Sequence, residues 1–295
     1  MQKEKITGHI FIFITITIWS VAFVSNKALL AYISPIENMI LRFFIAYILL
    51  LIIYPKYQLP SSFTDESKFF ILGFLGIFIY FLLENFALQF TQAANVGLYM
   101  GAIPLFTAIF AHFFTKDEKL SRSVVIGFLV AIVGIALILL DGASFQLRLK
   151  GDLLALSAAV VFALYSVALK LAPKGYHYIV ITRKSFFYGL LLMVIYFLIS
   201  GKSFHYHSLA ITTVWLNILF LGLISSGLAF ILWQQGIERI GSINASNYIY
   251  LVPLITAIAG IIALNEKLTL KMILGGVTIL IGLYIAQKKS SQISN

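Results

Sequence analysis

Two oppositely charged residues lie inside long apolar stretches of the sequence. Arg42 lies within residues 35–54 and Glu84 within residues 68–90. A charge in hydrocarbon costs at least about 2.5–3.5 kcal/mol, so such a residue normally has a partner or a role. A guanidinium can hold a carboxylate through paired hydrogen bonds, and a buried carboxylate can bind a proton or an ammonium group. We therefore predict that both residues bind a substrate. The alternatives are a structural ion pair between them, or an Arg42 side chain that reaches the lipid headgroups.

Two asparagine–tyrosine pairs share one spacing, Asn95 with Tyr99 and Asn244 with Tyr248. Residues four apart lie on the same face of a helix. Because an amide in lipid needs hydrogen-bond partners, such a face belongs in a protein interior or in a wet cavity. We predict that both pairs line a central substrate site. Hydrogen bonding between helices without a ligand is the other interpretation.

Other aromatic and amide residues within apolar runs are also predicted to contact the substrate, because aromatic rings stack on flat or cationic groups. These residues are Trp19, Asn26, Tyr80, Tyr165 and Gln234. A proline inside a helix leaves a carbonyl unpaired and permits a bend, and nearby glycines make bending easier. The residues predicted to act as gates in this way are Gly97, Gly101, Pro104 and Pro253.

Composition predicts that membrane helices position these residues. Of the 295 residues, 61% are hydrophobic and 11% are charged, against about 45–50% and about 25% in soluble domains. The formal net charge is +10, but the Lys and Arg residues are spread among the loops, which argues against nucleic acid as a partner. Cysteine is absent, so neither disulfides nor cysteine-ligated metals are expected.

Ten apolar runs are long enough to cross about 30 Å of hydrocarbon, and each is predicted to be a helix. They lie at about 9–31, 35–54, 68–90, 91–115, 122–140, 151–172, 178–200, 211–236, 243–264 and 271–287. Loops on the side of the N-terminus hold 12 Lys and Arg residues, and the opposite loops hold 6. This bias predicts a multi-pass protein with both termini in the cytoplasm.

The two halves of the chain, residues 1–145 and 146–295, repeat each other. Aligned pairs include Gly8 with Gly151, Arg42 with Arg183, Gly76 with Gly222, Asn95 with Asn244, Tyr99 with Tyr248, Pro104 with Pro253, Gly127 with Gly275 and Gly134 with Gly282. Because each half holds an odd number of spans, five, the second copy must be inverted. The predicted fold is an all-α integral membrane protein of ten transmembrane helices in two inverted five-helix repeats. Such repeats are typical of alternating-access transporters with a site near the middle of the membrane.

Arg183 has no obvious acidic partner, and its side chain is expected to reach the lipid headgroups. Small residues lie on one face of the fifth run at Gly127 and Gly134, and on one face of the tenth at Gly275 and Gly282. Such faces let helices approach closely. We expect these two helices to serve as scaffold or as the contact of a homodimer.

The sequence resembles the EamA-type proteins of the drug/metabolite transporter superfamily. The resemblance covers nearly the whole chain and is carried by Ala87-Leu88, Thr91, Pro104, Glu118 and Gly127 and, in the second half, by Ala245, Pro253, Asn265-Glu266 and Gly275. It implies a ten-helix fold in the plasma (inner) membrane. It also implies export or exchange of small metabolites such as amino acids.

No enzyme motif is found, neither H-E-x-x-H nor a P-loop, so no catalytic residue, metal or cofactor is predicted. Without a P-loop, an ion or substrate gradient is the expected energy source. Titration of Glu84 would couple transport to protons, and exchange against a counter-substrate fits equally well. Two alternatives stay open: a sodium-coupled ten-helix carrier, and a membrane-embedded enzyme that modifies lipids.

Overall fold

The computed structural model describes residues 2–91, 93–139, 148–201, 204, 206–255, 258 and 269–287, and this part of the chain contains helices and connections but no strand. Seven of its helices are long and apolar enough to cross a membrane: Lys3–Ala22, Pro35–Ile53, Phe63–Phe90, Leu149–Lys170, Tyr178–Ile199, Thr212–Ile240 and Leu270–Gln287. Two shorter apolar helices, Ile103–Phe114 and Arg122–Ile138, accompany them. The chain is therefore a multi-pass helical membrane protein.

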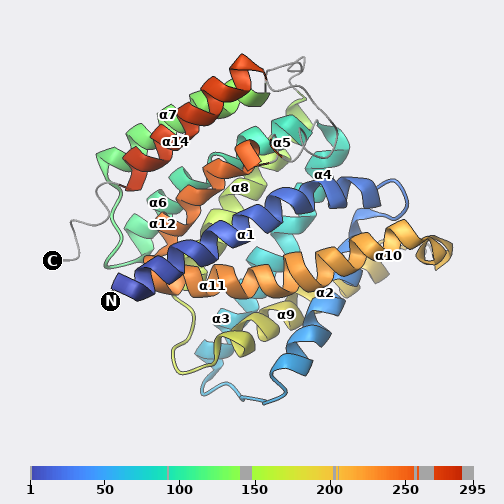
Figure 1. Cartoon of the computed structure of the whole chain (residues 1–295). Coiled ribbons are helices and arrows are strands. Elements are labelled where there is room, and N and C mark those ends of the chain that lie inside the picture. Colours follow the sequence, from blue (N-terminus) through green and yellow to red (C-terminus); the bar gives the residue numbers. More distant parts are fainter. Residues whose placement is uncertain are drawn as a thin grey trace.

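Figure 1 shows the helices as a single bundle, with the N-terminus near the start of α12. In chain order the elements are α1 (Gln2–Leu29), α2 (Pro35–Ile53), α3 (Phe63–Leu72), η1 (Gly73–Ile79), α4 (Tyr80–Phe90), α5 (Ala93–Met100), α6 (Ile103–Phe114), α7 (Arg122–Leu139), α8 (Leu149–Lys170), α9 (Tyr178–Ile199), η2 (Tyr206–Ala210), α10 (Thr212–Leu219), η3 (Phe220–Leu228), α11 (Ala229–Ile240), α12 (Ser242–Asn247), η4 (Tyr248–Tyr250) and α14 (Leu270–Gln287).

Two long helices contain a π-helical segment, in which each N–H bonds to the carbonyl five residues back. In η1–α4 the Tyr80 N–H bonds to the Leu75 carbonyl. In η3–α11 the Ala229 N–H bonds to the Ile224 carbonyl. Segments of this kind are rare and are frequent at functional sites. Here they lie directly before Tyr80 and around Ser225.

The fourth and ninth apolar runs are not continuous α-helices. In the fourth run α5 ends at Met100 and α6 begins at Ile103, with Pro104 in its first turn, where the missing N–H of proline has no partner to lose. In the ninth run α12 is followed by the single 3₁₀ turn η4 and by helical residues 251–255. The first interruption includes Gly101, and the second ends three residues before Pro253.

The glycine faces of α7 and α14 pack against each other within one chain. A methyl group placed on Gly127 would lie 2.6 Å from the Gly282 carbonyl oxygen, and one on Gly134 would lie 2.6 Å from the Gly275 oxygen. The two helices are therefore antiparallel and in close contact, along one edge of the bundle (Figure 1). These glycines serve as scaffold contacts inside the chain.

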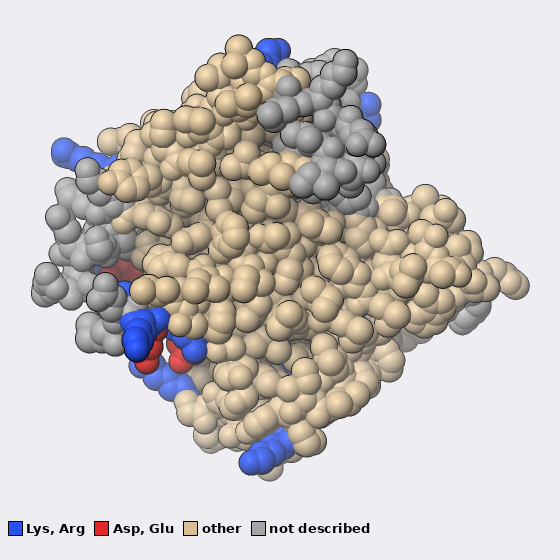
Figure 2. Space-filling model, in the orientation of Figure 1, with Lys and Arg blue, Asp and Glu red and all other residues tan. Residues whose placement is uncertain are grey.

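Many large apolar side chains are exposed on the surface, as a membrane protein requires. In Figure 2 the middle of the visible face is free of charged side chains, which gather near its margins. Large side chains such as Leu129, Val133 and Ile281 are exposed. The interior is filled by aromatic residues, among which Trp233, Tyr250, Phe43, Phe186 and Phe230 are fully buried.

Candidate functional site

A cavity lies between the helices in the middle of the bundle. Its volume is about 60 Å³, which is room for several waters. The residues that line it are Ile16, Trp19, Ala22, Asn26, Arg42, Tyr80, Phe81, Glu84, Met100, Ile103, Phe162, Ser225, Phe230, Ile249 and Val252. They come from α1, α2, α4, α5, α6, α8, η3, α11, η4 and the helical residues 251–255. Five of the predicted substrate residues, Trp19, Asn26, Arg42, Tyr80 and Glu84, lie in this wall.

Arg42 points from α2 into the bundle and is only 3% exposed. Its Nε donates to the Ser226 hydroxyl at 2.9 Å, and its Nη2 donates to the Ser225 hydroxyl at 3.2 Å. The guanidinium carbon also lies 4.7 Å from the centre of the Phe81 ring. The alternative in which Arg42 reaches the headgroups is therefore wrong. Neutral hydroxyls orient the guanidinium but leave its charge available to an anion.

Glu84 enters the same cavity from α4 and is 4% exposed. It lies one helical turn after Tyr80, whose hydroxyl is within hydrogen-bonding reach. Arg42 and Glu84 are near enough to interact electrostatically. However, these two described residues are not among the ion pairs within 4.0 Å. Arg42 and Glu84 therefore do not form a direct ion pair. Both side chains face the cavity.

Aromatic rings form much of the remaining wall. The Trp19 ring lies 5.8 Å from Phe162 and 5.5 Å from Phe230, both close to edge-to-face. Its indole N–H donates to the Ser225 carbonyl at 3.1 Å, which fixes the ring. Such a wall suits an apolar or aromatic portion of a ligand, and its ring faces also attract cations.

Asn26 is held by two further amides that the sequence analysis did not select. The Asn38 side chain donates to the Asn26 oxygen, and Asn26 donates to the Asn85 oxygen at 3.5 Å. Asn85 in turn donates to the Phe81 carbonyl at 2.7 Å. All three amides are buried. The signal that would have found Asn38 and Asn85 is their position within apolar runs, where an amide needs partners.

Ser225 and Ser226 are the other residues that sequence reasoning missed. Both are fully buried in η3 and bond to Arg42. Two adjacent serines in the middle of an apolar run could have indicated a buried polar site. Their partner could not be read from the sequence, since Arg42 is more than 180 positions away.

Several predicted residues lie elsewhere. Tyr165 packs on Gly76 of η1 and lies 5.7 Å from the Phe162 ring, behind the cavity wall. Gln234 accepts from the Thr182 hydroxyl at 2.7 Å, which joins α11 to α9. Neither side chain is among the residues that line the cavity.

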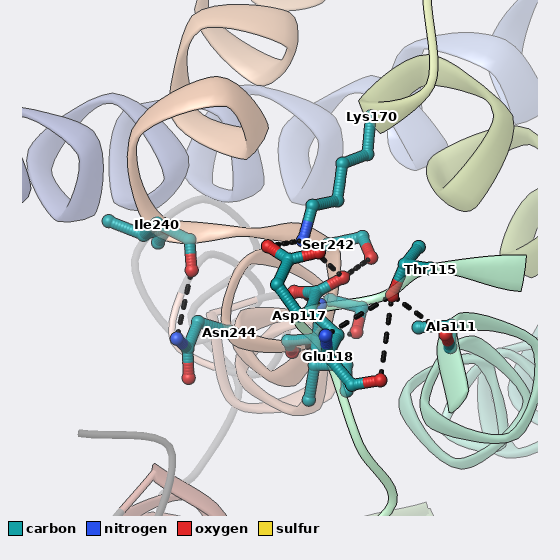
Figure 3. A network of polar contacts seen from close by, with 10 residues as sticks. Ala111, Thr115, Asp117, Glu118, Lys170, Ile240, Ser242 and Asn244 are labelled. Atoms are coloured by element: carbon teal, nitrogen blue, oxygen red, sulfur yellow. Dashed lines mark hydrogen bonds and ion pairs between the residues drawn. The ribbon is translucent and has the colours of Figure 1, made fainter. Parts of the chain in front are cut away.

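The two asparagine–tyrosine pairs also lie outside the wall, as far as the structure describes them. Tyr248 pairs with His9 at 2.9 Å between its hydroxyl and Nδ1. The Asn244 amide donates to the Ile240 carbonyl at 2.8 Å (Figure 3). Tyr99 is partly buried against the core, and the Asn95 side chain lies outside the described residues. Tyr248 therefore takes part in a contact between helices, and Asn244 bonds to the preceding turn. A substrate role for either pair stays a prediction.

The predicted gate residues lie next to the cavity without lining it. Met100 and Ile103 stand on either side of the interruption at Gly101 and both line the cavity. Val252, which precedes Pro253, lines it as well. A methyl group on Gly97 would meet no atom within 4 Å. The irregular backbone of both runs thus adjoins the cavity, and a gating role for these four residues stays a prediction.

Arg183, the repeat counterpart of Arg42, has a different environment. Its Nη1 donates to the Tyr54 carbonyl at 2.7 Å and its Nη2 to the Lys56 carbonyl at 2.8 Å. The prediction that it reaches the headgroups is wrong, because the end of α2 offers carbonyls that no longer have partners within their own helix. Arg183 is a structural residue that joins α9 to α2.

Comparison with known proteins places this chain in a family of membrane transporters. The EamA-like transporter family matches the chain twice, over residues 6–140 and again over residues 149–287. The chain belongs to this family.

Curated relatives of the chain are named as transporters. An "Uncharacterized transporter" of Clostridium kluyveri is 26% identical over 300 residues, covering 97% of this chain and 96% of the relative. "Uncharacterized transporter YyaM" of Bacillus subtilis is 28% identical and covers 88% and 87%. An "Uncharacterized transporter" of Archaeoglobus fulgidus is 26% identical and covers 94% and 97%. A solved crystal structure has the same fold, with a TM-score of 0.76, 19% identity and full coverage of both chains.

Proposed function

We propose that this membrane transporter carries small zwitterionic metabolites such as amino acids, and that Arg42 and Glu84 bind the two ends of the substrate. The observation that carries the proposal is that one guanidinium and one carboxylate face one cavity without being directly paired. The Arg42 guanidinium would hold the substrate carboxylate, and Glu84 with Tyr80 would receive its ammonium group. The carboxylate and the ammonium group of the substrate would then pair with the buried charges of Arg42 and Glu84.

The size and lining of the cavity support the same class of substrate. The cavity volume of about 60 Å³ limits the substrate to a small molecule. The walls beyond the two charges are aromatic and aliphatic: Trp19, Phe162, Phe230, Ile249 and Val252. An apolar side chain fits this lining better than a second charged group, because a second charge would have no partner.

We propose further that residues 1–145 and 146–295 are two inverted five-helix halves that enclose the cavity. Equivalent glycines have equivalent neighbours, which supports the arrangement. Gly8 packs against Arg239 and Ile240 at the end of α11, and its counterpart Gly151 packs against Thr91 and Phe90 at the end of α4. Such halves would open the cavity to the two sides of the membrane in turn.

The contact of α7 with α14 has the same symmetry. Gly127 faces Gly282, and Gly134 faces Gly275. In the predicted repeat Gly127 corresponds to Gly275, and Gly282 corresponds to Gly134. The first contact is therefore the symmetry equivalent of the second, as expected of a two-fold axis between the helices. This contact supports a pseudo-symmetric pair of halves within one chain.

The remaining features of the proposal rest on charge distribution and on family resemblance. The excess of Lys and Arg in loops on the N-terminal side supports cytoplasmic termini in the plasma (inner) membrane. Export, driven by proton coupling through Glu84 or by exchange against a counter-substrate, follows the resemblance to drug/metabolite transporters. Association into a homodimer would use a surface other than the glycine faces of α7 and α14, which are occupied.

The deciding experiment is tracer exchange in liposomes that contain the purified protein. Labelled amino acids are screened for counterflow, with and without an imposed pH gradient. Each positive compound is then tested in competition against its decarboxylated amine and its N-acetyl derivative. We expect the amino acid to compete at least about tenfold better than either derivative, because each derivative leaves one buried charge unpaired. Equal competition by all three would refute the zwitterion site, and no exchange of any metabolite above protein-free liposomes would refute the transport proposal.

A further inference from the structure

Another carboxylate of the bundle, Glu118, lies largely buried at the end where α1 begins. It belongs to the connection between α6 and α7, and its side chain is only 10% exposed. One oxygen accepts from the Ile243 N–H at 3.1 Å, and the other accepts from the Ser242 hydroxyl. Figure 3 shows the carboxylate in contact with the first residues of α12. Glu118 therefore joins the first half of the chain to the second.

Lys170 completes this network from the last turn of α8. Its ammonium group lies 3.2 Å from Glu118 and 2.6 Å from Asp117. The hydrogen bond from Lys170 holds the pKa of the Asp117 carboxyl below its usual range. The Asp117 side chain is 70% exposed, so its pairing contributes little. Glu118 is the buried partner, and its contacts dominate the network.

The backbone around Glu118 is arranged for close contact. Gly241, between α11 and α12, has φ of +83°, a conformation that glycine adopts at little cost. A side chain at this position would collide with the Glu118 carboxylate. On the other side, the Thr115 hydroxyl accepts from the Glu118 N–H at 3.2 Å and donates to the Ala111 carbonyl at 2.7 Å. The end of α6 thereby positions the carboxylate against α12.

Each element that the network joins also carries a residue of the cavity wall. The wall includes Ile103 from α6, Phe162 from α8 and Ile249 from η4, which continues α12. The network holds these elements together at one end, and their other parts surround the cavity. A path between these elements, from the cavity to this end, would open if they separated.

We propose that Glu118 is a latch: its bonds to α12 and Lys170 close the transporter at this end, and they break when the cavity opens there. This rests on the proposed alternating-access function. A positive and a negative residue that bridge separable helices give a contact that holds one conformation and is replaced by water in the other. In the proposed orientation, this end faces the cytoplasm.

The latch can be tested by access to the cavity, because the chain contains no cysteine. Val252→Cys places one reporter in the cavity wall. Its labelling by a membrane-impermeant, trimethylammonium-bearing methanethiosulfonate is timed in inside-out and right-side-out membrane vesicles. We expect Glu118→Ala to speed labelling from the side of the termini about tenfold, since one charge-assisted hydrogen bond shifts a two-state equilibrium by about that factor. Labelling from the opposite side should slow.

Two further variants make the test specific. Lys170→Gln keeps the bonds of Glu118 to α12 and should give a smaller increase in the same direction; it decides the question if Glu118→Ala does not fold. Glu66→Ala removes another ion pair, to Lys184 at 2.8 Å. That pair joins α3 to α9, and none of the lining residues described for the cavity comes from α9. With Glu66→Ala added, Val252→Cys should be labelled at the same rate as Val252→Cys alone.

Unchanged labelling in both latch variants, or an equal increase in Glu66→Ala, would overturn the latch. The labelling requires no substrate, so this result is separate from the metabolite screen. If exchange persists while the labelling rates are unchanged, only the latch is refuted. If no metabolite exchanges while the latch variants do change access, only the substrate proposal is refuted.

Discussion

Glu84 and Glu118, two carboxylates largely shielded from solvent, have opposite surroundings. Glu118 bonds directly to a lysine, a serine and a backbone N–H, and no empty space separates these groups. Glu84 shares an open cavity with Arg42 and has Tyr80 as its neighbour. A carboxylate whose partners are in the protein stabilises one conformation. A carboxylate that faces a cavity can accept a partner from outside, which is why we assign binding to one and closure to the other.

The two buried arginines differ in the same way. Arg183 donates to two carbonyls at the end of α2, whereas Arg42 donates to two serine hydroxyls beside the cavity. Both positions correspond in the internal repeat. If the predicted repeat holds, equivalent sequence positions have different tasks: we propose binding for Arg42, whereas the contacts of Arg183 are structural.

Substitution of Arg42 should have the largest effect on transport. We expect Arg42→Lys to weaken the apparent affinity for a zwitterionic substrate about 30-fold or more, because the paired hydrogen bonds to the substrate carboxylate are lost. Tracer counterflow at several substrate concentrations measures this. Arg183→Lys is the matched control: it should lower the melting temperature and leave the affinity of the folded protein unchanged. Equal loss of affinity in both variants would remove the distinction between the two arginines.

Glu84→Gln should have the next largest effect, chiefly on coupling to protons. The amide keeps the shape of the side chain but cannot take up or release a proton. We expect uptake driven by an imposed pH gradient to fall about tenfold or more, since proton transfer requires a titratable group. Exchange without a gradient should continue at saturating substrate, with a lowered affinity because the substrate ammonium group loses its charged partner. Glu66→Gln, the corresponding change outside the cavity, should leave both activities unaltered. A gradient response that survives in Glu84→Gln would exclude Glu84 as the coupling acid.

Ser226→Ala should have the smallest effect of the three. Arg42 would keep its bond to Ser225 but lose the one from Nε to Ser226, so its guanidinium would be less firmly oriented. We expect the apparent KM to rise about five- to tenfold with little change in the maximal rate, as for the loss of one hydrogen bond to a charged group. Ser166→Ala is the control, because the Ser166 hydroxyl bonds only to the Phe162 carbonyl among the described contacts. A rise in KM for both variants would point to general loosening of the core.

The sequence predicted much of the fold because membrane helices are encoded locally. Apolar runs of about 20 residues must be helical in lipid, and the structure has long apolar helices at seven of the ten predicted runs. The interruption of the fourth run was also foreseeable, since Gly101 and Pro104 are adjacent to it. The π-helical turns of η1 and η3 were not, because apolar pattern alone does not distinguish them from an α-helix.

For the site, the sequence by itself determined which residues are exceptional: Arg42 and Glu84 are costly in hydrocarbon wherever the fold places them. It could not determine their neighbours. Tyr248 and Gln234 looked like cavity residues by type and spacing, yet they bond to His9 and Thr182 instead. Hydrogen-bond partners are set by contacts between residues far apart in the chain. Only the tertiary structure, by bringing Ser225 and Ser226 to Arg42 and Glu118 to α12, decided which charges are satisfied and which remain available to a substrate.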